Sequence, residues 1–171
     1  RYMKIGGCIG NLGLADTMSI LSPFITNNTK LRSLELGGFT LNDRFAQLFE
    51  SALSGCNTTL QQFELNKCEG MTEGIMEKVI EVVASHPIKD LSFNEYDWND
   101  GVAEALGIAL SNNNTHLESL SLDGLDYDYQ EDRRGSMTEY GVEAVLDFIT
   151  SSYCSLKKLS FRSNTIGPLG G

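Results

Sequence analysis

A short apolar pattern recurs along the chain and constrains the fold more than any other feature. Each copy reads apolar-x-x-apolar-x-apolar, and five copies begin at residues 31, 60, 88, 117 and 156, with steps of 29, 28, 29 and 39 residues. A weaker sixth copy begins near residue 2, with Tyr2 and Ile5 in register but Gly7 in place of the third apolar residue. Self-similarity at such a period is typical of a stacked repeat array. The apolar positions of the five copies are Leu31, Leu34 and Leu36; Leu60, Phe63 and Leu65; Ile88, Leu91 and Phe93; Leu117, Leu120 and Leu122; and Leu156, Leu159 and Phe161.

Each copy is followed by a change from strand-like to helix-like spacing. Alternation with a period of two predicts a short strand with one buried face, and spacing at i, i+3, i+4 and i+8 predicts a helix. Residues that favour helix N-termini precede the helical stretches, at Asn42, Asp43, Thr72, Asn99, Asp100 and Thr138. Pro23 is expected to shorten or kink an earlier helical stretch at 18–26. The helical stripes are Phe45, Leu48, Phe49 and Leu53; Met71, Ile75, Val79, Ile80 and Val83; Val102, Leu106 and Leu110; and Val142, Val145, Leu146 and Ile149.

A strand and a helix cannot bury their apolar faces alone, whereas stacked copies can, each contacting only its neighbours. The sequence therefore predicts an α/β fold, a right-handed α/β solenoid of about six repeats of 28–29 residues. Because a helix is wider than a strand, we expect parallel strands on the concave side and helices on the convex side. Residues 1–171 are expected to form a single array with an insertion at about 126–135. We expect a fragment of a longer array, because neither end shows a polar capping repeat.

The repeats resemble leucine-rich repeats of the ribonuclease-inhibitor type, in which LxxLxLxx(N/C)xL is followed by a helix. The resemblance covers residues 31–166 well and residues 2–30 loosely, and it implies a horseshoe-shaped arc. At the ninth position of the pattern Cys68 and Asn164 match, whereas Phe39, Tyr96 and Leu125 depart from it. Apolar packing is therefore expected to replace part of the polar ladder that this family has beneath the turns.

Charge and cysteine content argue against several classes of protein. A net charge of −10 argues against nucleic-acid binding, which needs clustered cations. No apolar stretch approaches the roughly 20 residues of a membrane span. The chain shows no signal-peptide pattern, so we expect a cytoplasmic protein that does not bind membranes. The four cysteines and two histidines lack the short paired spacings of a zinc site, so neither a metal nor a disulfide framework is expected.

No combination of residues indicates an enzyme. His86 and His116 lie in separate turns, and no serine or cysteine with a nucleophile signature accompanies them. The glycines near the start of the chain, Gly6, Gly7 and Gly10, do not form a phosphate-binding loop. We therefore expect no catalytic residues and no cofactor.

Side chains between the apolar strand positions are expected to face the concave surface, where a rigid scaffold concentrates binding residues. The alternative is that they are only the solvated side of a sheet. Residues 117–150 hold nine acidic residues and two arginines, which would steer a basic partner unless this charge serves solubility alone. The candidate partner-binding residues on the strands are Glu35, Gln62, Glu64, Asn66, Asp90, Ser92, Asn94, Glu95, Ser119, Ser121 and Asp123.

The insertion falls between a strand and a helix, so it is expected to project from one rim of the arc. Asp126, Tyr127, Asp128 and Tyr129 complete the candidate contact set, because tyrosines anchor many interfaces. A loop without function is one alternative. A calcium loop is another, although its glycine and closing glutamate are not in place.

These observations favour a protein–protein interaction scaffold that binds a protein partner on its concave strand face. The resemblance implies the same, since ribonuclease inhibitor and the sensor ends of NACHT-type receptors use such arrays for recognition. One alternative is a GTPase-activating regulator similar to Ran GTPase-activating proteins, for which Arg133 and Arg134 are the only adjacent pair of arginines. Another is the substrate-recognition array of a ubiquitin-ligase adaptor.

Overall fold

The structure is a computed structural model that describes residues 2–6, 22–54, 59–96, 98–113, 116–124, 137–150 and 155–164. Residues 22–26 are helical with Pro23 in the first turn, where proline is tolerated, and the remainder of the predicted 18–26 stretch lies outside the described residues. The other elements are β1 (Tyr2–Gly6), β2 (Ser33–Gly37), α2 (Asp43–Ser54), β3 (Gln62–Asn66), α3 (Glu73–Ala84), β4 (Asp90–Tyr96), α4 (Asp100–Asn113), β5 (Ser119–Gly124), α5 (Glu139–Thr150) and β6 (Lys158–Ser160).

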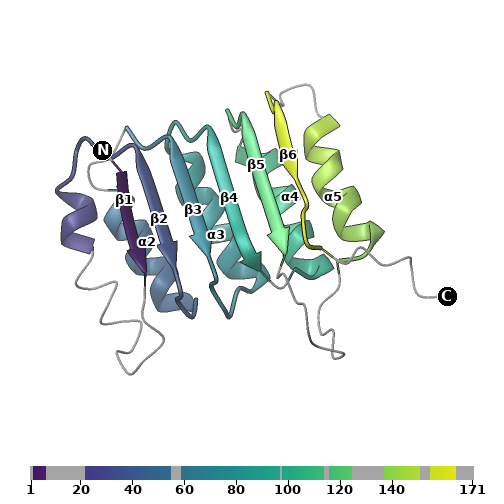
Figure 1. The fold of residues 1–171 in the computed structure, drawn as a ribbon, viewed down its shortest axis with the longest axis horizontal. Helices are drawn as coiled ribbons and strands as arrows, with labels where there is room; N and C mark the ends of the chain where they lie inside the picture. The colour runs from purple at the N-terminus through teal and green to yellow at the C-terminus, as the bar shows by residue number, and fades with distance from the viewer. Residues whose placement is uncertain are drawn as a thin grey trace.

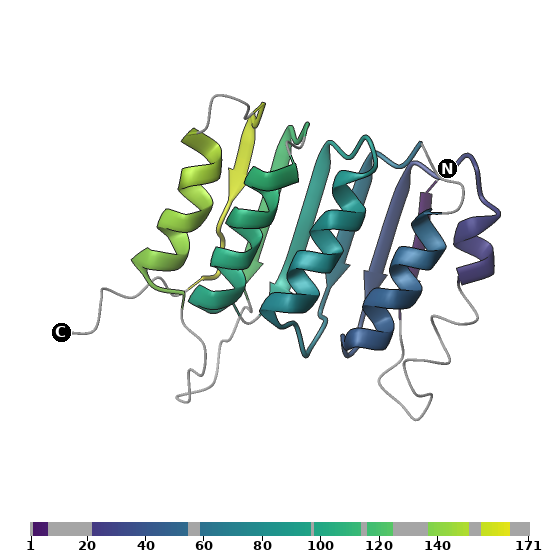
Figure 2. The same cartoon turned by 180° about the vertical axis from the view of Figure 1, so that it is seen from behind.

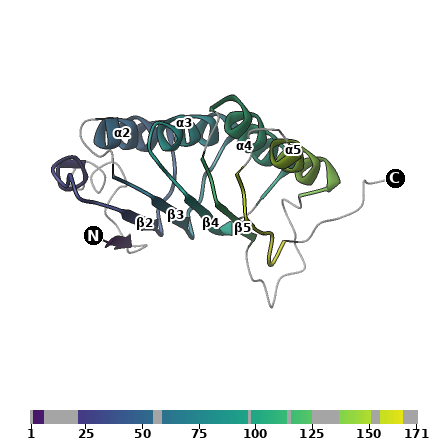
Figure 3. The same ribbon diagram turned by 90° about the horizontal axis from the view of Figure 1, so that it is seen from above.

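The strands form one parallel sheet whose order follows the chain, from β1 to β6 (Figure 1). Helices α2, α3, α4 and α5 lie in a single layer on one face of this sheet, as the views from behind and from above show (Figures 2 and 3). From β2 onward, the chain therefore passes from each strand to a helix and then to the neighbouring strand. The prediction of an α/β fold with parallel strands alternating with helices is confirmed.

The apolar residues that define the repeat fill the space between the two layers. Across β2 to β5, the residues at the last two apolar positions of each copy are at most 1% exposed. They pack against the buried helix faces, and the rings of Phe49 on α2 and Phe63 on β3 lie 4.9 Å apart between centroids. Removal of this apolar surface from water is the main term that stabilises the layers. The residues in these two rows are Leu34, Phe63, Leu91 and Leu120, and Leu36, Leu65, Phe93 and Leu122.

The weak sixth copy is a strand, but its predicted register is wrong by two residues. Ile5 is paired with Leu36, whereas the sequence alignment places it opposite Leu34. Met3 takes the place opposite Leu34 and packs against the core. Since side chains alternate along a strand, Tyr2 then lies on the other face of the sheet, where it is 63% exposed.

The predicted helix N-termini are confirmed at α2, α3, α4 and α5. Side-chain oxygens of Asn42, Thr72, Asn99 and Thr138 accept hydrogen bonds from backbone N–H groups of the following turns, at 2.9, 3.3, 3.0 and 3.3 Å. Each bond satisfies one N–H group that has no partner within its own helix. Met71 was expected in the stripe of the second helix, but it precedes α3, because Thr72 is the N-cap.

The predicted apolar stripe of α5 is wrong at one position. Leu146 is 40% exposed, whereas Phe148 is 3% exposed and belongs to the core. Helix α5 packs against α4, and no described helix lies on its other side. A residue that points to that other side therefore stays in contact with solvent, although the helical spacing is unchanged.

Residues at the ninth position of the pattern lie beneath the turns that follow the strands. Phe39 and Tyr96 are buried in the core, which confirms apolar packing at these two turns. The Cys68 thiol lies 4.0 Å from the carbonyl oxygen of Leu36, and Asn164 Nδ2 donates to the carbonyl oxygen of Leu122 at 2.5 Å. Leu125 and the predicted insertion at 126–135 lie outside the described residues.

Candidate partner-binding face

The side of the sheet opposite α2–α5 is called here the strand face, and no described helix covers it (Figure 3). The parallel register places its side chains in rows that run across the strands. One row is Tyr2, Ser33, Gln62, Asp90, Ser119 and Lys158, and the next is Lys4, Glu35, Glu64, Ser92, Ser121 and Ser160. The strand face therefore presents polar groups at positions that are fixed by the backbone.

Glu35 is the one described polar residue that this face buries, with 7% of its surface exposed. The Lys4 ammonium forms an ion pair with its carboxylate, and the Tyr2 hydroxyl donates to Glu35 Oε2 at 2.5 Å. These hydrogen bonds from Lys4 and Tyr2 lower the pKa of Glu35 below 4.5, although burial acts in the opposite direction. Glu35 is thus held ionised, but it is covered by residues of β1, in contrast to the accessible contact residue that the sequence predicts.

Hydrogen bonds within and between neighbouring strands join the side chains in the middle of the face. Asn94 Nδ2 donates to Glu64 Oε1 at 2.8 Å, and Asn94 Oδ1 accepts from the hydroxyls of Ser92 and Ser121 at 2.9 and 3.3 Å. Asn66 Nδ2 also reaches Glu64 Oε1, at 3.4 Å. The bonds link β3, β4 and β5, so side chains of three successive repeats hold one another in place.

Two further carboxylates on the strand face accept hydrogen bonds from uncharged groups. Gln62 Nε2 donates to Asp90 Oδ2 at 3.1 Å. Asp123 Oδ1 accepts from the Ser160 hydroxyl at 2.6 Å and from the backbone N–H of Arg162 at 3.0 Å. In the described part of the chain neither carboxylate forms an ion pair.

The chain leaves the strands through turns with left-handed backbone. Lys67, Glu95 and Ser163 have φ values of 52°, 54° and 55°, and Gly38 has 72° at the equivalent position. Left-handed backbone is uncommon for residues other than glycine, and its recurrence marks it as a feature of the repeat. Lys67 Nζ lies 2.7 Å from Glu95 Oε2, so the predicted contact residue Glu95 is already paired with a neighbouring turn.

The structure thus brings together on one open face the predicted strand residues from Gln62 to Asp123, apart from Glu95, which lies in a turn. The four candidates in the insertion, Asp126, Tyr127, Asp128 and Tyr129, lie outside the described residues. Tyr2 and Lys4 also lie on this face, although the sequence pattern does not predict them there. The signal that could have predicted their position is the alternation along the strand: Met3 and Ile5 are apolar, so the alternate residues Tyr2 and Lys4 point to the other side of the sheet.

An exposed ion-pair cluster lies at the end of the sheet where the strands begin. Glu118 accepts from Lys89 Nζ and Lys157 Nζ, each at 2.7 Å, so the cluster joins three successive repeats. Hydrogen bonds from Lys157 and then Lys89 lower the pKa of Glu118 from 4.5 to about 2. This cluster adds fixed charge beside the strand face but does not lie on it.

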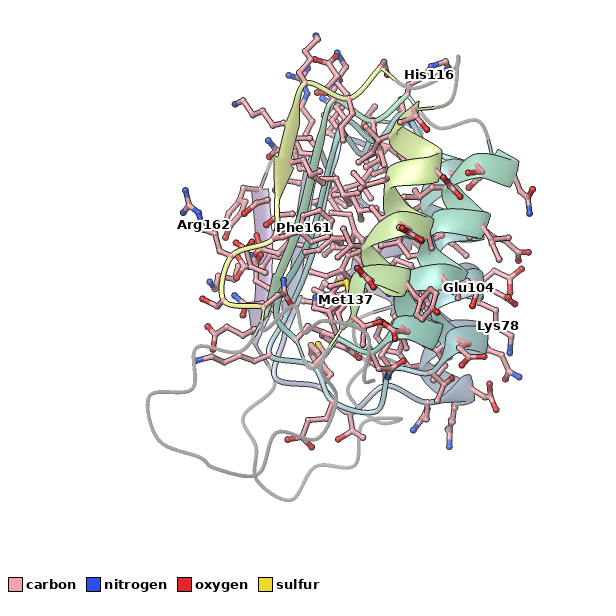
Figure 4. All side chains as sticks on the ribbon, turned by 90° about the vertical axis from the view of Figure 1, so that its right-hand side faces the viewer. Lys78, Glu104, His116, Met137, Phe161 and Arg162 are labelled. Atoms are coloured by element: carbon pink, nitrogen blue, oxygen red, sulfur yellow. The ribbon has the colours of Figure 1, made fainter. Side chains whose placement is uncertain are left out.

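The opposite side of the molecule, called here the helix face, differs in charge. Helices α2–α5 carry ten acidic residues and two basic ones. In Figure 4, Lys78 and Glu104 project from the helices away from the sheet, and Arg162 projects on the strand side. Part of the acidity expected to steer a partner, at Glu139, Glu143 and Asp147, lies on α5 and therefore not on the strand face.

Neither a metal centre nor a membrane span is found in the described ranges. Their His, Cys, Asp and Glu side chains form no group of three or more that could hold a metal ion. None of their helices is long and apolar enough to cross a membrane. No protein-family model matches the chain, and a search of curated proteins finds no significant match.

Proposed function

We propose that the chain is a leucine-rich repeat array similar to ribonuclease inhibitor, and that it is a protein-interaction module without catalytic activity. Strand order that follows the chain and helices on one face support a solenoid. A doubly wound nucleotide-binding sheet instead reverses its strand order and carries helices on both faces. The ninth position adds support, because Cys68 and Asn164 contact carbonyl oxygens of equivalent residues, Leu36 and Leu122, in the preceding repeats.

The strand face is the proposed binding surface. The observation that carries this proposal is the set of polar side chains in register, joined from strand to strand, on a face that no described helix covers. Side chains that are already fixed lose little freedom when a partner binds, which favours affinity. The alternative, a solvated side of the sheet that binds no partner, does not require hydrogen bonds between side chains of neighbouring strands.

The carboxylates of Glu64, Asp90 and Asp123 indicate the chemistry of the partner. Each accepts hydrogen bonds from uncharged groups of the described chain, and they lie on the successive strands β3, β4 and β5. A partner that places lysine or arginine side chains over the middle of the face would neutralise them. Complementary charge of this kind favours fast association and correct orientation.

The test is affinity capture followed by mass spectrometry with two matched variants. The strand-face variant carries Glu64→Lys, Asp90→Lys and Ser121→Lys. The helix-face control carries Glu77→Lys, Glu104→Lys and Ser111→Lys, at exposed helix positions, and has the same net charge. We expect a partner to bind the native protein and the control but to be lost from the strand-face variant, with circular dichroism showing that both variants fold. Equal retention of partners by the two variants would contradict the proposal.

No described residue favours the alternative functions. The hypothesis of a GTPase-activating regulator depends on Arg133 and Arg134, which lie outside the described residues. A GTP-hydrolysis assay without stimulation by this chain would remove it. The hypothesis of a substrate-recognition array in a ubiquitin-ligase adaptor depends on an adaptor-binding segment elsewhere in the protein.

A further inference from the structure

The strand face carries charge of both signs, and the two signs lie on different strands. The carboxylates on β3, β4 and β5 are Glu64, Asp90 and Asp123. Strand β6 adds Lys158 to the same face, because Lys158 pairs with Ser119 in the parallel register. Arg162 follows Lys158 by an even number of residues, and it projects on the strand side in Figure 4. The charge of the face therefore changes from negative on β3–β5 to positive at β6.

Neither of the two cations at β6 belongs to an ion pair of the described chain. At the other end of the face, by contrast, Lys4 on β1 pairs with Glu35 on the neighbouring strand. Asp123 lies on the strand next to β6, but its Oδ1 atom accepts from the backbone N–H of Arg162, and the guanidinium forms no ion pair with it. Both cations have exposed side chains, so a charged group of another molecule can reach them.

The distance between the two signs limits the shape of a partner. Asp90, Ser119 and Lys158 lie in one row on three successive strands. Because neighbouring strands are about 4.8 Å apart, the backbone positions of Asp90 and Lys158 are about 10 Å apart. An α-helix rises by this distance in about seven residues, and residues at that spacing lie on the same side of the helix. One helix of a partner can therefore contact both signs.

We propose that the partner of the strand face carries a basic group that lies over β3–β5 and an acidic group that lies over β6. This inference rests on the proposed function and adds the direction in which the partner lies across the strands. A partner with basic groups alone would be repelled by Lys158 and Arg162. A mixed partner in the reverse direction would place like charges against each other at both places, which disfavours that direction.

The test measures the binding of two synthetic helical peptides by fluorescence anisotropy at low salt. The mixed peptide carries two lysines and, about seven residues further along the same side, two glutamates. The basic peptide carries lysines at all of these positions. The β6 variant of the chain carries Lys158→Glu and Arg162→Glu. We expect this variant to bind the mixed peptide about 3–10-fold more weakly than the native chain does, and the basic peptide more tightly.

Two outcomes of this comparison would overturn the proposal. One is the absence of binding between the mixed peptide and the native chain. The other is binding of the mixed peptide to the β6 variant that is unchanged or tighter, as expected for a face that selects basic groups only. Circular dichroism shows whether the β6 variant is folded.

A matched control excludes a general effect of net charge. It carries Arg44→Glu and Lys78→Glu, which replace exposed cations of α2 and α3 and give the same net charge as the β6 variant. We expect the control to bind the mixed peptide as the native chain does. Equal weakening in the control and the β6 variant would also overturn the proposal.

The strand-face variant with Glu64→Lys, Asp90→Lys and Ser121→Lys separates this inference from the proposed function. It should bind both peptides more weakly than the native chain. Unchanged binding of both peptides by this variant would contradict the strand face as the binding surface. Weaker binding by this variant, together with unchanged binding of the mixed peptide by the β6 variant, would contradict only the direction of docking.

Discussion

Leu91 and Leu159 occupy the same position of the repeat but differ greatly in burial. Leu91 on β4 is 1% exposed, whereas Leu159 on β6 is 38% exposed. Strand β4 has β3 and β5 on its two sides, and β6 has β5 on one side and no described strand on the other. A side chain in this fold is therefore covered by the neighbouring repeats as much as by its own.

The same contrast applies to the strand face. Glu64 and Asn94 on the inner strands are held by side chains from adjacent strands. Lys158 and Arg162 at β6 have exposed side chains. Fixed polar groups therefore concentrate on β2–β5, and this is where we expect the partner to make its main contacts.

The largest expected effect is a direct comparison of Leu91→Ala with Leu159→Ala. Leu91→Ala removes a fully covered side chain and leaves a cavity, so it should lower the free energy of unfolding by about 2–5 kcal/mol. Leu159→Ala removes a side chain that is already partly in water and should cost less than about 1 kcal/mol. Urea unfolding followed by circular dichroism measures both. Equal losses in the free energy of unfolding for the two variants would contradict the claim that neighbouring repeats cover Leu91 more than Leu159.

Contact between helices of successive repeats is tested by Gly107→Ala. A Cβ atom at Gly107 on α4 would run into the carbonyl oxygen of Ala144 on α5. The two helices would have to move apart, at an expected cost of about 1–3 kcal/mol in the free energy of unfolding. The matched control is Gly74→Ala on α3, where a Cβ atom meets nothing within 4 Å, and it should stabilise the helix by about 0.5–1 kcal/mol. The same sign for both substitutions, measured by urea unfolding, would contradict this packing.

Asp100 links two repeats through hydrogen bonds. Its carboxylate accepts from the backbone N–H and the hydroxyl of Thr138, at 2.7 and 2.8 Å, and from the backbone N–H of Gly141 at 3.2 Å. Asp100→Ala should therefore cost about 1–2 kcal/mol, as expected for the loss of a helix cap. Glu104→Ala, at an exposed site on α4, should stay within about 0.5 kcal/mol of the native protein. Thermal unfolding of both variants measures the two losses of stability. Equal losses for Asp100→Ala and Glu104→Ala would exclude a capping role of Asp100.

The smallest expected effect is the pH dependence contributed by Glu118. Its pKa is lower in the folded protein than the ordinary 4.5, at about 2, so its ion pairs stabilise the fold above that ordinary value. This contribution is lost as the pH falls from about 4.5 towards about 2. Because the cluster is exposed, the effect should be small and should weaken in high salt. Urea midpoints measured across this range should fall less steeply for Glu118→Gln, and superimposable profiles would contradict the ion-pair account.

Sequence alone was sufficient where two independent signals agree. In the repeats from Leu31 to Phe161, the apolar triplets and the capping residues both predict the same alternation of strand and helix. The side of the sheet to which each strand residue points can also be predicted, because side chains alternate and the apolar residues mark the buried side. Their cross-strand partners depend on register between repeats that are far apart in the chain, and no local pattern contains that information.

Sequence was insufficient where one signal is weak or a neighbour is missing. Gly6 and Gly7 leave the first strand with only Met3 and Ile5 as apolar markers, so the repeat pattern predicts a register that differs by two residues from the observed one and assigns Tyr2 to an apolar position. Leu146 has the spacing of a buried residue, but burial also needs a helix on the side to which it points. The spacing along a helix shows which residues share a face, but it does not show whether another helix covers that face.

Carboxyl footprinting of the captured complex tests directly whether the proposed partner binds the strand face of β2–β5. A carbodiimide couples a small amine to accessible Asp and Glu side chains, and mass spectrometry locates the label. We expect the complex to lose labelling at Glu64, Asp90 and Asp123, while Glu77, Glu104 and Glu143 on the helix face are labelled as in the free protein. Protection of the helix-face residues with unchanged labelling of the strand-face residues would contradict it.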